Sequence, residues 1–227
     1  MHPSYKNDPS LGKEVHAYLV KQGLETPMTD QVKQSAEKKI EAITDSFSDI
    51  MIELGLDTTD DSLMDTPKRV AKAFVNDLAA GCYNDLPNVT AFPSDGYDGM
   101  VFQGGIPIKS FCSHHHLPFT GRAHVAYIPS KEGKVIGLSK LNRIVEHYGR
   151  RPQIQEGLTM QIHKAIDEIC EGNKGVAVMI SATHTCACLR GIKHDGCEMK
   201  TSKLSEDFLD DGSTRSEFYQ FISDWKK

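Results

Sequence analysis

Two apolar helical stretches between two β-rich segments constrain the fold of this chain more than any other feature. Residues 154–169 place apolar side chains on one side of a helix, at Ile154, Leu158, Ile162, Ile166 and Ile169. Residues 138–148 have the same period, residues 122–128 alternate and are rich in β-forming residues, and residues 176–182 have the character of a buried strand. This order predicts an α+β fold with an antiparallel sheet.

The N-terminal part of the chain is expected to be helical. Apolar periods predict helices over residues 14–21 and 31–54, followed by Gly23 and Gly55, and a third helix from Thr66 to Gly81. Residues 1–10 are expected to be frayed. Residues 82–100 are rich in Asn, Asp, Pro and Gly and are predicted as a loop. This loop separates a helical N-terminal region, residues 1–95, from a second domain, residues 96–227.

Two further elements are expected after the central helices. Residues 186–192 could pair with residues 176–182 as a hairpin, and residues 214–225 have the apolar period of a terminal helix. Both would belong to the second domain.

Composition and charge exclude several classes of protein. The 227 residues carry a net charge of −5, so the chain as a whole has no attraction for nucleic acid or for an anionic membrane. The sequence has no run of about 18 apolar residues, so no transmembrane helix is expected. The N-terminus also lacks the apolar stretch of a secretory signal. We therefore expect a cytoplasmic protein, whose six cysteines are thiols or metal ligands rather than a disulfide framework.

Two segments rich in cysteine and histidine carry the strongest functional signal. They are Cys112-Ser113-His114-His115-His116 and His184-Thr185-Cys186-Ala187-Cys188. A thiolate and imidazoles this close suit zinc, although a polar loop with incidental histidines has the same composition. Two ligands from the first segment and one thiolate from the second would leave a coordination position for water, as in catalytic zinc sites. Histidines that do not bind the metal are then placed to move protons.

Basic residues beside these segments indicate an anion site. They are Lys140 and Arg143 at the start of a helix, Arg190 after the second segment, and Arg69 and Lys72 on an N-terminal helix. Their convergence would make a phosphate pocket in a chain of negative net charge, whereas each one alone is also typical of a solvated surface. Glu156 begins a helix, where a carboxylate also stabilises the helix dipole.

Over about residues 14–222 the chain resembles GTP cyclohydrolase I of the zinc-dependent bacterial type. The resemblance rests on five motifs in this order: HAYLVKQGLETP, DDSLMDTPKRVAKAF, FCSHHHLPFTGRAHVAYIP, VIGLSKLNRIVEHYGRRPQIQEGLT and THTCACLRG. It implies a tunnelling fold, in which an antiparallel sheet carries two helices on one face and follows a helical N-terminal region. It also implies a homo-oligomer, a decamer of two stacked pentameric rings with active sites between subunits.

The resemblance further implies a reaction that uses Zn²⁺. Members of this family convert GTP and water to 7,8-dihydroneopterin triphosphate and formate, the first step of tetrahydrofolate synthesis or of a related pterin or deazaguanine pathway. By motif, the residues that resemble the zinc ligands are Cys112, His115 and Cys186.

Roles in substrate binding and proton transfer follow from the same motifs. His114 resembles the proton donor to the purine ring, and His184 the acid and base of the later rearrangement, with Ser139 near the ribose. Glu156 resembles the carboxylate that recognises guanine. The residues that resemble the triphosphate clamp are Arg69, Lys72, Lys140, Arg143 and Arg190.

Three positions depart from the family's motifs. Ser113 stands where Glu is usual, His116 replaces an apolar residue, and Gly157 occupies a common Arg position. Two alternatives to the cyclohydrolase follow. One is a tunnelling-fold enzyme for another purine or pterin, such as a nitrile reductase, whose Glu-Ser-Lys type motif this sequence lacks. The other is a non-catalytic, zinc-stabilised assembly or regulatory subunit, in which His116 or Cys188 would be a fourth ligand.

Overall fold

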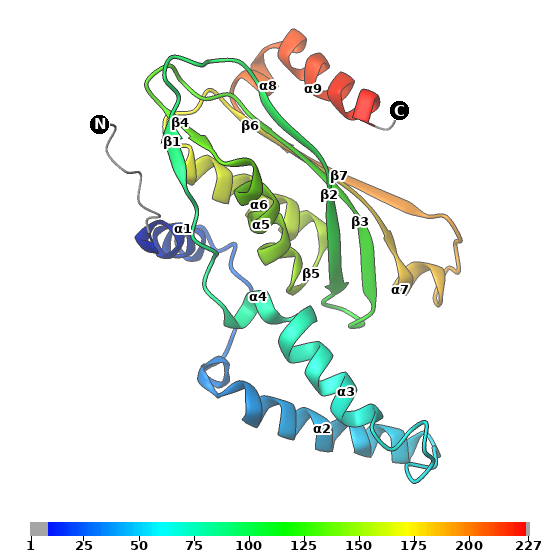
Figure 1. Ribbon diagram of the computed structural model, residues 1–227. Helices are drawn as coiled ribbons and strands as arrows, with labels where there is room; N and C mark the ends of the chain where they lie inside the picture. The colour runs from blue at the N-terminus through cyan, green and yellow to red at the C-terminus, as the bar shows by residue number, and fades with distance from the viewer. Residues whose placement is uncertain (1–8, 226–227) are drawn as a thin grey trace.

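A five-stranded sheet lies at the centre of the C-terminal part of the chain. The computed structural model describes residues 9–225. The strands lie in the order β5 (Pro152–Gln153), β2 (Val101–Cys112), β3 (Pro118–Tyr127), β6 (Val176–His184) and β7 (Glu198–Leu204) (Figure 1). Neighbouring strands are antiparallel, except that β5 runs parallel to β2. The predicted α+β class with an antiparallel sheet is therefore confirmed.

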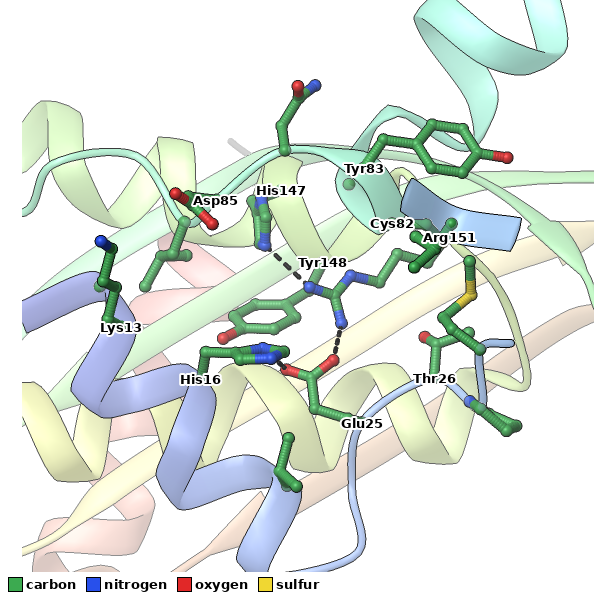
Figure 2. Close-up of a pocket in the computed structure, with 18 of the residues that line it drawn as sticks. Lys13, His16, Glu25, Thr26, Cys82, Tyr83, Asp85, His147, Tyr148 and Arg151 are labelled. Carbon is green, nitrogen blue, oxygen red and sulfur yellow. Dashed lines mark hydrogen bonds and ion pairs between the residues drawn. The ribbon is translucent and has the colours of Figure 1, made fainter. Parts of the chain in front are cut away.

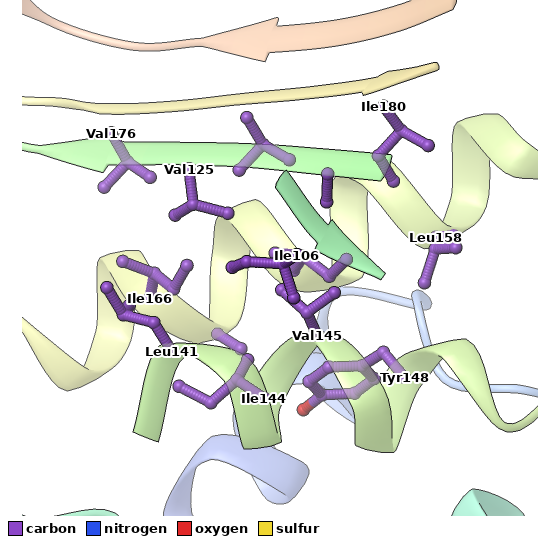
Figure 3. Close-up of a cluster of buried hydrophobic side chains, with 14 of the residues drawn as sticks. Ile106, Val125, Leu141, Ile144, Val145, Tyr148, Leu158, Ile166, Val176 and Ile180 are labelled. Atoms are coloured by element: carbon purple, nitrogen blue, oxygen red, sulfur yellow. The ribbon is translucent and has the colours of Figure 1, made fainter. Parts of the chain in front are cut away.

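Helices α5 (Leu138–Gly149) and α6 (Gln155–Ile169) cover one face of this sheet, as expected for the tunnelling fold (Figure 1). Their apolar side chains meet strand residues such as Val125 and Val176 in one buried cluster, which Figure 3 shows. Fully buried on α6 are Leu158, Ile162, Ile166 and Ile169. Burying one such side chain stabilises the fold by about 1.5–3 kcal/mol, so this cluster holds both helices against the sheet.

Helices α8 (Asp207–Asp210) and α9 (Gly212–Trp225) cover the opposite face at one end of the sheet (Figure 1). Strand β3 shows the two faces clearly, because Val125 and Tyr127 join the main cluster while Ala126 packs in a second cluster with Phe208 and Phe218. The predicted terminal helix is therefore confirmed, and it begins at Gly212.

The N-terminal region is helical, as predicted, with shifted boundaries. Helix α1 (Pro9–Lys21) begins before residue 14 and buries Val15 and Leu19 in the main cluster. The fraying expected for residues 1–10 is thus wrong for residues 9 and 10, and residues 1–8 lie outside the described part of the chain. None of the helices within residues 9–225 combines the length and apolar character needed to cross a membrane.

The helix predicted over residues 31–54 is divided into a 3-10 turn η1 (Asp30–Lys33) and helix α2 (Ala36–Glu53). Ser35 causes the division, because its backbone is extended and its hydroxyl accepts a hydrogen bond from the Lys38 N–H at 3.4 Å. Helix α3 (Thr66–Ala73) packs against α2, and the two extend away from the sheet (Figure 1).

Gly81 does not end the third helix. Helix α3 continues into a π-helix η2 (Phe74–Leu78) and a short helix α4 (Ala80–Tyr83), which contains Gly81. A Cβ atom added to Gly81 would lie 2.1 Å from the carbonyl oxygen of His147. Glycine is therefore needed here for the close approach of α4 to α5, and the prediction of a helix stop was wrong.

Strand β2 has no counterpart among the strands expected from the sequence, because Gly104, Gly105 and Pro107 are typical strand breakers. Its register against β3 shifts between Gln103 and Ile106, where Gly105 has a φ of +68°. The ring of Trp225 covers this bulge, since a Cβ atom on Gly105 would lie 1.8 Å from it. The predicted loop over residues 82–100 likewise contains a short strand β1 (Ala91–Pro93), which pairs with β4 (Lys134–Ile136).

The hairpin expected from residues 186–192 is wrong. Residues at its start form a short helix α7 (Thr185–Cys188), and β6 pairs instead with β7. Strand β7 is at the sheet edge and alternates between exposed and partly buried residues, so its sequence EMKTSKL lacks the apolar character of a central strand.

Candidate metal centre and active site

Three potential metal ligands converge where β2 ends and α7 begins. Ligand atoms of Cys112, His115 and Cys186 all lie within 4.8 Å of one another. Cys112 is the last residue of β2 and is buried, His115 is on the exposed turn that follows, and Cys186 is half-buried in α7. Within residues 9–225 this group does not include His116 or Cys188, the residues considered as a fourth ligand.

Backbone hydrogen bonds shape the turn that presents Cys112 and His115. The Cys112 N–H donates to the Leu117 carbonyl, and the His116 N–H donates to the Cys112 carbonyl, each at 2.9 Å. The His115 N–H lies 3.3 Å from the Cys112 sulfur. His116 has a φ of +52° and its ring packs on that of Phe111, with centroids 5.4 Å apart, so the turn directs it toward an aromatic neighbour.

The two thiols differ in acidity. Burial alone would raise the pKa of the Cys112 thiol, but hydrogen bonds with the backbone of His115 and Leu117 bring that pKa below its ordinary value. Burial and the neighbouring Cys112 sulfur raise the pKa of Cys186. The negative charge of one thiolate opposes the ionisation of the other. A bound divalent cation would offset this repulsion because it favours both thiolates. Two thiolates and an imidazole are a donor set that fits zinc.

His184, the last residue of β6, has one neighbour stacked on the face of its imidazole ring and another at its Nε2 atom. The Phe119 ring stacks on it with centroids 4.5 Å apart and planes at 11°, and Nε2 lies 2.8 Å from Oε1 of Gln155. Burial lowers the pKa of His184 below its ordinary value, while the Glu156 carboxylate opposes the shift. At neutral pH the imidazole is therefore mainly uncharged and able to accept a proton.

The structure brings three more of the expected site residues, His114, Glu156 and Arg190, to this cluster. The rings of His114 and His115 have centroids 6.3 Å apart. Glu156 lies in the first turn of α6, close enough for its charge to act on His184. The guanidinium nitrogen Nη1 of Arg190 lies 2.6 Å from Nε2 of His115.

The remaining site residues lie elsewhere in this chain. Ser139, Lys140 and Arg143 are on the first turns of α5, whereas its last turn leads to β5, which pairs with Cys112. At 1.5 Å per residue, the helix separates Ser139 from Gly149 by about 15 Å. Arg69 and Lys72 lie on α3, where Arg69 pairs with Asp65 at 3.2 Å. Phe74, just beyond the end of this helix, lies near the turn of residues 113–116, because its ring is 5.9 Å from that of Phe111 at the end of β2.

A separate cavity of about 580 Å³ lies between α1, α4 and the end of α5 (Figure 2). In its wall, Glu25 pairs with Arg151 and also lies 3.1 Å from His16, while Arg151 lies 2.8 Å from Nε2 of His147. Burial, assisted by the Arg151 charge, lowers the pKa of His147 to about 3. Figure 2 shows these four side chains joined in one network. None of the expected site residues lines this cavity.

Gln155 is the site-adjacent residue that the sequence analysis did not single out. It precedes Glu156 directly and is buried at the start of α6. Its place beside the candidate substrate carboxylate Glu156 was the only signal in the sequence, because its contact with His184 depends on a strand distant in sequence.

The sequence profile of GTP cyclohydrolase I matches residues 43–223. A curated relative from Aeromonas salmonicida, named GTP cyclohydrolase 1, is 44% identical over 214 residues, which are 92% of this chain and 96% of the relative. A relative of the same name from Photobacterium profundum is 44% identical over 210 residues, 92% and 95% of the two chains. Another from Alkalilimnicola ehrlichii is 48% identical over 185 residues, 80% and 97% of the two chains.

Proposed function

Since the chain belongs to the GTP cyclohydrolase I family, we propose that Cys112, His115 and Cys186 hold the zinc ion of a GTP cyclohydrolase active site. The enzyme converts GTP and water to 7,8-dihydroneopterin triphosphate and formate. The observation that carries the metal proposal is the convergence of three ligand atoms within 4.8 Å. A non-catalytic subunit is not favoured, because the relatives named as cyclohydrolases match over nearly their whole length.

The donor set supports zinc on chemical grounds. Zinc held by three protein ligands supplies a Lewis acid that activates water at neutral pH. The backbone around Cys112 contributes by favouring its thiolate, the form that binds metal. The exposed turn of His115 leaves the site accessible to substrate.

Two histidines would move protons around the reacting purine. His114 is exposed and adjoins the metal ligand His115, a position from which it would protonate the purine ring nitrogen as the imidazole ring opens. His184 would serve as acid and base in the later ribose rearrangement and ring closure, assisted by Ser139. The mainly neutral state of His184 supports this role, because it can accept a proton first.

Glu156 and Arg190 would bind the two ends of GTP. The Glu156 carboxylate has two acceptor oxygens, which match the two adjacent N–H donors on the guanine edge. Arg190 lies beside His115 and would bind the triphosphate together with Arg69, Lys72, Lys140 and Arg143.

We propose that the site is completed by other copies of the chain in a homo-oligomer, a decamer of two stacked pentamers. Lys140 and Arg143 lie at the end of α5 remote from the metal ligands, which supports a contribution from a neighbouring subunit. Helix α2 and the segment that joins it to α3 also expose large apolar side chains suited to contact between copies, at Ile50, Ile52, Leu54, Leu56 and Met64.

We also propose that the enzyme acts in the cytoplasm and begins tetrahydrofolate synthesis or a related pterin or deazaguanine pathway. Six free cysteines among residues 9–225 support a reducing compartment.

The zinc proposal is tested by measuring metal and both products together. Purified enzyme is incubated with GTP, and formate release and the fluorescent oxidised neopterin are followed. We expect one zinc per subunit and both products. Chelation and Cys186→Ala should abolish metal and activity, whereas Cys188→Ala, which changes a cysteine of the same short helix outside the cluster, should keep both. Full zinc content and activity in Cys186→Ala would refute the ligand assignment.

Shared sites are tested by complementation. Cys186→Ala and Arg143→Ala should each be inactive, because one lacks a metal ligand and the other a phosphate contact. Coexpression should restore part of the activity if the two residues act in one site from different subunits. Mixed oligomers with no more activity than the two parents would refute the shared site, and sedimentation analysis reports the number of subunits.

A further inference from the structure

Gln155 connects His184 to the interior of the fold through several hydrogen bonds. Its side chain is 1% exposed. On one side, Nε2 lies 3.2 Å from the Ile180 carbonyl, 3.0 Å from the Met199 carbonyl and 3.1 Å from Oγ1 of Thr201. On the other side, Oε1 lies 2.8 Å from Nε2 of His184.

These contacts determine how the amide is oriented. Carbonyl oxygens only accept hydrogen bonds, so the amide nitrogen of Gln155 must face Ile180 and Met199. The amide oxygen then faces His184, and because this oxygen also only accepts, Nε2 of His184 must carry a hydrogen. In a neutral imidazole, Nδ1 is therefore the nitrogen with a free lone pair.

We infer that Gln155 is a positioning residue that holds His184 in its Nε2–H tautomer and leaves Nδ1 to exchange protons with the substrate. The inference rests on the proposed function, in which His184 is an acid and base. A flip of the ring would put a carbon where Nε2 now lies and would break the bond to Gln155. The hydrogen bond therefore selects both the tautomer and the orientation of the ring.

Two neighbouring contacts make this arrangement rigid. Phe119 lies opposite His184 in the pairing of β3 with β6, and its stacked ring limits tilting of the imidazole. Thr201, which accepts from Gln155, lies 2.7 Å from Oγ1 of Thr159 on α6. Helix α6, strand β6 and strand β7 thus all contribute to the placement of one imidazole.

Gln155→Met tests the inference, because it nearly conserves volume and removes both ends of the amide. His184 should then populate both tautomers, and the steps assigned to it should slow. General acid–base catalysis contributes about 100-fold or more, so we expect neopterin formation to fall by about 10- to 100-fold in kcat. Formate release, assigned to the earlier ring opening, should fall much less, and the KM for GTP should change little. The ratio of formate to neopterin should therefore rise above that of the wild type.

Gln161→Met is the matched control. Gln161 is also a buried glutamine of α6, 3% exposed, and its amide donates to the Leu24 carbonyl at 2.6 Å, away from His184. Loss of this amide should lower stability but leave the product ratio as in the wild type. A ratio that rises equally in both variants would show a general structural effect and overturn the inference.

The tautomer is measured directly by solid-state ¹⁵N spectra of histidine-labelled enzyme, with His184→Asn to assign the signals. We expect Nε2–H in the wild type and a mixture in Gln155→Met. If Gln155→Met does not assemble, Thr201→Val removes one acceptor of the amide and should shift the ratio and the tautomer in the same direction. A wild-type ratio together with an unchanged tautomer would overturn the inference. Wild-type enzyme that released neither product would instead refute the proposed function.

Discussion

Glu25 and Arg151 form an ion pair although 126 residues separate them in the chain. Their side chains are 14% and 4% exposed, so the pair is largely removed from water. Arg151 directly precedes β5, which pairs with the strand end at Cys112, and the Gln153 carbonyl accepts a hydrogen bond from the Ser113 N–H at 3.2 Å. The pair therefore joins the segment after α1 to the start of the turn of residues 113–116 that follows β2.

Removing the Arg151 charge should destabilise the fold strongly. Arg151→Met leaves the Glu25 carboxylate with a reduced set of partners in a buried place, and loss of one partner of a buried ion pair costs about 3–5 kcal/mol. The measurement is thermal unfolding at fixed protein concentration. The adjacent Arg150 pairs with Glu146 at 2.6 Å, with side chains 42% and 56% exposed, so Arg150→Met should cost only about 0–1 kcal/mol. Equal shifts in melting temperature would contradict the distinction.

Acid should destabilise the protein through His147. Burial lowers the folded-state pKa of His147 to about 3, below the unfolded value near 6.5, so unfolding takes up a proton between these pH values. Stability should fall as pH falls from about 6.5 toward 3, by up to about 1.4 kcal/mol per pH unit from this group. His147→Gln keeps an acceptor for Arg151 and cannot titrate. Urea unfolding from pH 7 to pH 4 should therefore show a shallower pH dependence in this variant, and an identical slope would rule His147 out.

Glu156→Gln should weaken the enzyme's discrimination between guanine and other purine bases. The amide would present a donor to one of the two guanine N–H donors, and a lost charged hydrogen bond costs about 1.5–3 kcal/mol, or about 10- to 100-fold in kcat/KM. Inosine triphosphate lacks the exocyclic amino group and serves as an internal control. We expect the preference for GTP over inosine triphosphate to shrink in Glu156→Gln. An unchanged preference would place guanine recognition elsewhere.

Two glycines should respond in opposite ways to alanine. At Gly157, on α6, an added Cβ meets only Cγ1 of Ile154, at 3.6 Å, so Gly157→Ala should stabilise the protein by about 0.5 kcal/mol through helix propensity. At Gly81 the same change would bring Cβ to 2.1 Å from a backbone oxygen, so α4 and α5 must separate. Differential scanning calorimetry should show a higher melting temperature for the first variant and a lower one for the second.

The elements that were predicted well are those whose own residues carry the pattern. Helices α5 and α6 each carry an apolar face, and β3 is rich in β-forming residues, so the pattern of each is visible locally, although residues 123–127 of β3 are buried on both faces of the sheet. Strand β2 was missed because it contains glycine at a bulge. Gly105 is needed there since the ring of Trp225, a residue far along the chain, packs directly on it. Strand β7 was missed because an edge strand buries little. The bulge of β2 and the edge position of β7 both depend on how distant segments are arranged in the sheet, which the local pattern does not contain.

The candidate site likewise combines features that the sequence predicted with features that depend on the fold. Sequence by itself determined the fold class and, through motifs, the family and the residue types that could bind zinc and move protons. Tertiary structure alone decided that Cys186 meets Cys112 and His115, that Gln155 contacts His184, and that Lys140 lies at the end of α5 remote from these three residues of its own chain. The physical reason is that a side chain's chemistry is local, whereas its neighbours, and therefore its pKa, tautomer and partners, depend on how strands and helices pack.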